Sequence, residues 1–173
     1  MIWWMWLVWL IVLTFGFVVF RGAPYVPSRR RYIKEAFSKL YPLTDKDVLI
    51  DVGSGDGIVL RLASEFGARA IGYELNPILV IISRFISGRD KNVSVKLADF
   101  WLMAIPDDTT VVYAFMVTRD IKKFVKKMES EVVRIKHPVH LILYGNKLPE
   151  RTADKTLQGY RLYTFSPLQI DKP

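Results

Sequence analysis

Apolar and polar positions follow two different periods along most of the chain. Short, nearly continuous apolar runs predict buried strands at residues 48–52, 70–75, 93–98, 109–116, 139–144 and 160–165. Apolar residues at helical spacing predict helices at residues 28–41, 58–66, 76–87 and 119–136. Strands that alternate with helices, most of them apolar on both faces, indicate an α/β fold. In such a fold a parallel sheet is covered by helices on both faces.

The first 20 residues depart from this pattern because they are apolar and carry no charge. The segment MIWWMWLVWLIVLTFGFVVF holds four of the five tryptophans. Twenty helical residues span about 30 Å, the thickness of a bilayer core, so we predict one transmembrane helix over residues 1–20. Residues 21–41 then carry six basic residues against one acidic residue. By the positive-inside tendency, the predicted protein is single-pass, with its body on the cytoplasmic side, or on the matrix side if mitochondrial.

Two other interpretations of the apolar segment are weaker. A cleaved signal peptide places basic residues before its apolar core, whereas here they follow it. A core helix that is apolar all round needs burial on every face. The sequence therefore predicts an anchor at residues 1–20, a basic linker with the first helix at 21–44, and a domain at 45–173.

Composition narrows the possible chemistry. The 173 residues carry a formal charge of +8 and no cysteine, which excludes disulfides, thiolate zinc sites, cysteine nucleophiles and iron–sulfur ligation. His137 and His140 have no evident third ligand, so we expect no metal.

Most of the excess positive charge borders the apolar segment, which favours the lipid bilayer over nucleic acid as partner. We expect a solvated basic face on the last predicted helix, made by Lys122, Lys123, Lys126 and Lys127.

Glycines and carboxylates gather where the predicted strands end. The sequence DVGSGDG, residues 51–57, leads from the first strand into a helix. Glu74 ends the second strand and Asp99 follows the third. In a doubly wound sheet, ligands bind at the carboxyl ends of the strands. Glycines there permit positive φ and let backbone amides approach a ligand closely. We therefore expect the functional site at this edge.

Three nucleotide-like ligands compete for such a turn. A dinucleotide fingerprint needs a third glycine at position 58, which is Ile58, and no Gly-Lys-Ser/Thr triplet completes a phosphate loop. Asp51 and Asp56 disfavour a polyphosphate and suit a ligand with an ammonium or sulfonium charge. S-adenosylmethionine carries both charges, so we favour it as the cofactor.

The other strand ends fit the rest of that cofactor. The Glu74 carboxylate is placed to accept hydrogen bonds from two ribose hydroxyls. Asp99 is placed to contact the adenine amino group, and Phe100 or Trp101 to cover the adenine ring. Acidic side chains at three successive strand ends make the assignment more specific than the glycine turn alone.

These residues resemble a known family. The run DVGSGDGIVLRLASEFGARAIGYELNPILVIISRF is similar to the glycine loop and second-strand motif of the membrane-anchored class I protein-lysine methyltransferases. That family includes the enzymes that act on the mitochondrial ATP synthase c-subunit and on the adenine nucleotide translocase. The similarity extends upstream to GAPYVPS and downstream to ADFW. It implies a Rossmann-like class I methyltransferase fold, S-adenosylmethionine as cofactor, and as substrate a lysine of a protein at or in the membrane.

The resemblance also implies roles for individual residues. Those implied to bind the cofactor are Asp51, Gly53, Gly55, Gly57, Glu74, Asn76 and Asp99, to which we add Ser54, Asp56 and Phe100. Residues 24–28 are implied to close over the cofactor and to shape a lysine channel. Our channel candidates are Tyr25, Pro27, Ser28 and Tyr113, with Tyr144 as a further one. The segment YGNKLPER departs from the family pattern, since only Pro149 matches.

The expected reaction is transfer of an activated methyl group to a neutral lysine amine, which mainly needs alignment. A partly apolar channel favours the neutral amine because it disfavours the ammonium. No dedicated general base is evident.

The segment AFMVT at the end of the fourth strand lacks the Asn/Asp-Pro-Pro-aromatic signature of enzymes that methylate amino groups of nucleic-acid bases. This argues against DNA adenine as the substrate. Two other functions stay open: a small-molecule or lipid methyltransferase, and a catalytically silent cofactor-binding membrane protein.

Overall fold

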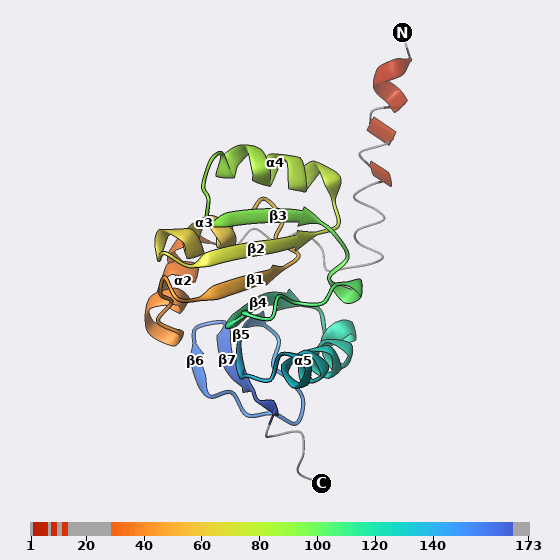
Figure 1. Ribbon diagram of the computed structural model, residues 1–173. Helices are drawn as coiled ribbons and strands as arrows, with labels where there is room; N and C mark the ends of the chain where they lie inside the picture. The colour runs from red at the N-terminus through yellow and green to blue at the C-terminus, as the bar shows by residue number, and fades with distance from the viewer. Residues whose placement is uncertain (1, 7, 10–11, 14–28, 168–173) are drawn as a thin grey trace.

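The computed structural model describes residues 2–6, 8–9, 12–13 and 29–167 of the chain (Figure 1). In chain order its helical elements are α2 (Arg30–Glu35), η1 (Ala36–Leu40), α3 (Ile58–Glu65), α4 (Pro77–Ser87), η2 (Phe100–Leu102), η3 (Thr118–Asp120) and α5 (Ile121–Ile135). The strands are β1 (Val48–Val52), β2 (Arg69–Glu74), β3 (Val93–Leu97), β4 (Val111–Met116), β5 (Val139–Gly145), β6 (Lys155–Leu157) and β7 (Tyr160–Phe165).

The strands form one sheet in the order β3-β2-β1-β4-β5-β7-β6. The first five of these are parallel, and β7 is antiparallel to both β5 and β6. The chain winds outward from β1 to β3 and then returns to β4 on the other side of β1. In Figure 1 the arrowheads of β1, β2 and β3 point to the same edge of the sheet. The gap between β1 and β4 at that edge is the topological switch point, where α/β sheets bind ligands.

Two apolar clusters cover the sheet, one on each face, because strand residues alternate between faces. Helices α2 and α3 close the first cluster, in which Leu49 of β1 and Tyr113 of β4 take part. Helix α5 closes the second, which includes Ile50 of β1 and Phe124 of α5. The sheet is therefore buried between helices, as the apolar strand runs predicted.

The expected α/β sheet with helices on both faces is confirmed, with two corrections at its ends. The expected strand at residues 160–165 is present, but it runs antiparallel to β5 and pairs with a short additional strand, β6. No helix lies between β5 and β7. A parallel strand would need a crossover connection, whereas the connection at residues 146–154 lets the chain reverse its direction. The helix expected at residues 28–41 is α2 followed by the wider, π-helical turn η1.

The predicted single-pass membrane location is wrong. Within the residues that the structure describes, no helix is long and apolar enough to cross a membrane. Spanning needs about 20 helical residues, and the described helical stretches of the expected anchor are residues 3–6, 8–9 and 12–13. The rest of that anchor and the linker up to residue 28 lie outside the described residues.

Helix α4 contacts the sheet through a narrow face only. Leu79, Val80 and Ser83 are its buried residues, and it lies beside the β3 edge in Figure 1. The opposite side is apolar as well but faces outward, with the Phe85 side chain 86% exposed. Phe85 therefore contributes little to the packing of the domain.

Gly72 of β2 is required by the packing around it rather than by its backbone conformation. A Cβ at this position would lie 2.4 Å from Ser54 Oγ and 2.7 Å from Leu60 Cδ1. We expect Gly72→Ala to lower the free energy of unfolding by about 1–3 kcal/mol, because the overpacked core must shift. Urea denaturation measures this. As a comparison, Gly88→Ala introduces a Cβ into open space, so any loss of stability there comes from its positive φ and not from packing. Unchanged stability in Gly72→Ala would contradict the packing argument.

Candidate functional site

The glycine turn after β1 is held against the end of β2 by its backbone. The N–H groups of Gly53 and Ser54 both donate to the Tyr73 carbonyl oxygen, at 2.9 and 3.2 Å. Gly53, Gly55 and Gly57 have φ values of 77°, 55° and 78°, in the left-handed region that favours glycine. A Cβ at Gly53 would meet no atom within 4 Å. At that point the backbone faces open space, so a ligand can approach it closely.

Glu74 joins two turns at the carboxyl edge. Its Oε2 accepts a hydrogen bond from the Gly55 N–H at 2.8 Å, and its Oε1 accepts one from the Asn76 N–H at 2.7 Å. The residue is only 5% exposed. Each carboxylate oxygen has a second lone pair, so the group can accept further hydrogen bonds from a ligand. Glu74 thus orients the glycine turn and the start of α4 around one carboxylate.

Asn76 supplies the N-cap of α4, as the sequence predicted. Its Oδ1 accepts hydrogen bonds from the N–H groups of Ile78 and Leu79, at 2.9 and 3.5 Å. The residue is fully buried, and its Nδ2 has no partner in the described part of the chain. A buried donor without a partner is costly, so it is a polar group that a ligand can satisfy.

Asp51 is a buried acid at the switch point. It lies in β1 between Gly72 of β2 and Tyr113 of β4, and it is 3% exposed. No donor among residues 29–167 hydrogen-bonds its carboxylate. Burial raises the pKa of the Asp51 carboxyl well above its ordinary value, and the carboxylates of Glu74 and Asp56 raise this pKa further. A cation at this point would relieve the repulsion among these groups.

Asp56 differs from Asp51 because it already has a cationic partner. Its Oδ2 lies 3.3 Å from Nη2 of Arg61, and its Oδ1 accepts a hydrogen bond from the Ile58 N–H at 3.3 Å. Nη1 of Arg61 also donates to the Asp56 carbonyl oxygen at 2.5 Å. Asp56 therefore stabilises the start of α3, and its contact with a cofactor stays a prediction.

The segment after β3 brings Asp99 and two aromatic rings to the same edge. Oδ1 of Asp99 accepts a hydrogen bond from the Trp101 N–H at 3.0 Å and caps η2. Phe100 is buried and stacks on Phe124, with ring centroids 5.9 Å apart. Trp101 is only partly buried. Of the two rings expected to cover an adenine, Trp101 is therefore the more accessible.

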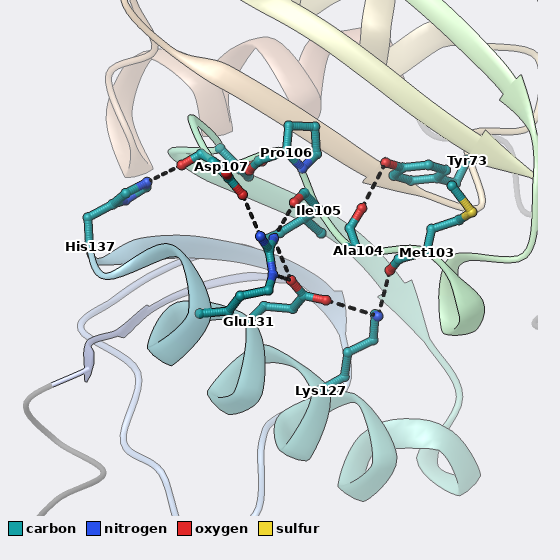
Figure 2. A network of polar contacts seen from close by, with 11 residues as sticks. Tyr73, Met103, Ala104, Ile105, Pro106, Asp107, Lys127, Glu131 and His137 are labelled. Carbon is teal, nitrogen blue, oxygen red and sulfur yellow. Dashed lines mark hydrogen bonds and ion pairs between the residues drawn. The ribbon is translucent and has the colours of Figure 1, made fainter.

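Helix α5 contacts the segment after η2 through a polar network that is buried at Lys127 and Glu131 and exposed at Asp107. Lys127 Nζ donates to the Met103 carbonyl oxygen at 2.7 Å and lies 3.3 Å from Glu131 Oε1. Arg134 pairs with Glu131 at 2.8 Å and also bonds Asp107 and the Ile105 carbonyl oxygen. Figure 2 shows Lys127 and Glu131 of α5 facing the backbone that follows η2. The network thereby holds the backbone of residues 103–107 against α5.

This network was not predicted from the sequence. The solvated basic face predicted for this helix is present at Lys122, Lys123 and Lys126, which are exposed, but not at Lys127, which is mostly buried. Lys123 Nζ also lies 4.2 Å from the Trp101 ring centroid. The available signal was the spacing of Lys127, Glu131 and Arg134, which places them on one side of a helix. The network also reaches β2, because burial of the Tyr73 hydroxyl and the nearby charge of Glu131 together raise the pKa of Tyr73.

The expected channel residues are described only in part. Tyr25, Pro27 and Ser28 lie outside the described residues. Tyr113 is buried in β4, where its ring contacts Phe37 and its hydroxyl lies 3.4 Å from that of Tyr160. Its place next to Asp51 in the sheet is consistent with a channel, and its role stays a prediction.

Comparison with solved structures identifies the fold. An RNA methyltransferase from Salinibacter ruber, solved with S-adenosyl-L-homocysteine, has a TM-score of 0.70 at 24% identity. The alignment covers 81% of this chain and 92% of that one. The fold is that of the class I methyltransferases. The Rossmann-like methyltransferase sheet expected from the sequence is therefore confirmed.

Sequence comparison finds relatives of one kind. The chain is 33% identical over 112 residues to the ATP synthase c-subunit lysine N-methyltransferase of Xenopus laevis, covering 63% of this chain and 48% of that protein. It is 31% identical over 132 residues to the adenine nucleotide translocase lysine N-methyltransferase of Mus musculus, covering 72% and 56%. The chain thus spans about half the length of the curated relatives it matches. No protein-family model matches it.

The raised pKa of Asp51 predicts how stability depends on pH. An unfolded Asp has a pKa of about 3.9, so in the folded chain the proton is bound more tightly. The protonated Asp51 side chain makes its full contribution to the free energy of unfolding below about pH 4. This contribution is lost as the pH rises through the pKa of Asp51 in the folded chain. We expect Asp51→Asn to raise the melting temperature by at least about 2 °C near pH 7, with a smaller gain at pH 4. The exposed Asp45→Asn is the control, and an equal gain in it would contradict the assignment.

The α5 network predicts a contrast between two glutamates on one helix. Glu131→Ala leaves Lys127 mostly buried without its carboxylate, and we expect a loss of about 2–3 kcal/mol in unfolding free energy. Glu129 pairs with Arg151 nearer the surface, so Glu129→Ala should cost less than about 1 kcal/mol. Urea denaturation of both variants tests this. Similar losses would mean that the network does not anchor the segment after η2.

Proposed function

We propose that this protein is an S-adenosylmethionine-dependent methyltransferase that methylates a lysine side chain of a protein. The observation that carries the proposal is the carboxyl edge of the sheet. There, buried Asp51 and Glu74 flank a glycine turn whose backbone faces open space. The class I methyltransferase fold and the lysine methyltransferases among the relatives support it.

The residues at this edge fit the cofactor on three independent grounds. Asp51 is a buried carboxyl group without a donor among residues 29–167. Its pKa is raised first by burial and then by the charges of Glu74 and Asp56, and an ammonium would offset both effects. Gly53 leaves space that a Cβ would fill beside the backbone. Asn76 offers a buried amide donor without a partner in the described residues. A polyphosphate would meet repulsion from the same carboxylates.

The roles of the individual residues follow from their positions. We assign the cofactor's ammonium to Asp51, its ribose hydroxyls to Glu74, and its adenine to Asp99 with Trp101. The bound cofactor supplies a sulfonium methyl group that is already activated for transfer. The protein then has to orient the acceptor and keep water away, because alignment accounts for most of the rate gain in such a transfer. Glu74 contributes by fixing the glycine turn and Asn76 to each other.

A protein lysine is the acceptor that the relatives favour. Both named kinds act, by their names, on lysines of proteins, the ATP synthase c-subunit and the adenine nucleotide translocase. The structural likeness to an RNA methyltransferase, at 24% identity, concerns the fold. The segment Ala114 to Thr118 after the core of β4 also lacks the Asn/Asp-Pro-Pro-aromatic signature used for amino groups of bases.

The proposal predicts transfer of label to protein. The purified full-length chain, incubated with a cell extract and methyl-labelled S-adenosylmethionine, should place label in lysine residues, identified by mass spectrometry. We expect Asp51→Asn to weaken cofactor binding at least about ten-fold in calorimetry, because the ammonium loses its carboxylate. The same variant should be at least as stable as wild type, which separates a binding defect from unfolding.

The contradicting results are equally specific. Label that enters only the RNA or lipid fraction would refute the lysine acceptor and leave the cofactor assignment intact. Absence of cofactor binding by the wild-type chain would refute the methyltransferase assignment as a whole. Asp45→Asn, which changes an exposed carboxylate before the start of β1, controls for the chemical change itself.

A further inference from the structure

Aromatic side chains continue from the switch point toward the outer strands. Tyr113 and Phe115 of β4, Tyr144 of β5 and Tyr160 of β7 form a row of contacting rings. The ring centroids of Tyr113 and Tyr160 are 6.2 Å apart, those of Tyr144 and Tyr160 4.7 Å, and those of Phe115 and Tyr144 5.9 Å. Tyr113 and Tyr160 are buried, whereas Phe115 and Tyr144 are partly exposed. The row therefore runs from the core to the surface.

The register places this row beside the proposed cofactor site. Asp51 pairs with Tyr113, and paired residues of neighbouring strands point to the same face. Phe115 lies two residues beyond Tyr113 on that face, about 7 Å closer to the carboxyl edge. Phe115 pairs with Tyr144, and Tyr144 pairs with Tyr160. The three outer rings thus lie along the same edge of the sheet as the glycine turn, on the other side of the switch point.

Two glycines allow the backbone to approach these rings. A Cβ at Gly159 would lie 2.8 Å from Cε2 of Tyr144, and a Cβ at Gly145 would lie 3.3 Å from Cε2 of Phe115. Gly159 does not have a positive φ, so its backbone conformation does not require glycine. The close approach of the Tyr144 ring therefore accounts for the glycine at position 159. The rings are packed against backbone on one side and partly exposed on the other.

The rings on the two faces of the sheet differ in their charged neighbours. On the α5 face, Lys or Arg side chains lie over the rings of Tyr73, Phe100, Trp101 and Phe165. Within the described part of the chain, no lysine or arginine lies over Phe115, Tyr144 or Tyr160. An aromatic face attracts cations through its quadrupole. The partly exposed rings of Phe115 and Tyr144 can therefore accept a cation from another molecule.

We propose that the partly exposed rings of Phe115 and Tyr144, with the buried ring of Tyr160 packed against Tyr144, form an aromatic ammonium site that receives the lysine side chain of the protein substrate. This inference rests on the proposed function, because it places the methyl acceptor beside the cofactor edge. Added methyl groups spread the charge and weaken hydration of the lysine nitrogen, so the site binds a methylated ammonium more tightly than an unmethylated one. It thereby retains a partly methylated lysine. That nitrogen then releases its proton to solvent, and its lone pair forms the new N–C bond as the S–C bond of the cofactor breaks.

The test compares a cation with its neutral isostere. The full-length protein is titrated with acetyl-Nε-trimethyllysine amide, and separately with the analogue in which carbon replaces the charged nitrogen. NMR shifts of the tyrosine rings report binding. We expect wild type to prefer the cation about ten-fold. Tyr144→Leu should lose this preference, and Tyr144→Phe should keep it because the ring remains. Phe85→Leu makes an equivalent deletion of a ring on the exposed face of α4 and should change nothing.

Equal affinity of wild type for the two probes, or a preference that survives in Tyr144→Leu, would overturn the site. Unchanged cofactor affinity verifies that Tyr144→Leu is folded, and if that variant does not fold, Phe115→Leu carries the same expectation. The probes bind without turnover, so the outcome is independent of catalysis. A wild type that shows the preference but labels no lysine would refute the proposed function while supporting the aromatic site.

Discussion

The carboxylate of Glu74 is the interaction on which the functional edge depends. It receives the N–H of Gly55 on one oxygen and that of Asn76 on the other, so two turns from different parts of the chain share one anchor. Few other groups can replace it, because both donors are backbone amides that point at one buried position. The glycine turn, the cap of α4 and the end of β2 are therefore fixed together, and Asp51 lies beside them on β1.

Much of this arrangement was predictable from the sequence because it depends on local rules. Apolar runs and helical spacing gave the order of the elements, and Asn76 followed by Pro77 gave the cap of α4. The acidic residues at the ends of the strands converge because parallel strands end at one edge. These features need only periodicity, capping and the topology of a doubly wound sheet.

The remaining features depend on contacts between distant residues. The sequence does not reveal that Gly72 makes room for Ser54, or that Lys127 turns inward to a carbonyl 24 residues before it. The antiparallel β7 was missed because a strand's apolar pattern does not encode its direction. The transmembrane prediction was wrong because apolar composition was treated as evidence of a single long helix, which the described residues do not contain.

The glycine turn has a consequence for how such a protein can diverge. The surface that we propose for the cofactor is made of backbone at positive φ, where any side chain introduces strain, so few substitutions are tolerated there. The rings at the ends of β4 and β5 are side chains on regular strands, and they can be exchanged without moving the turn. If the proposed roles hold, the acceptor site can therefore change by substitution while the cofactor site stays the same.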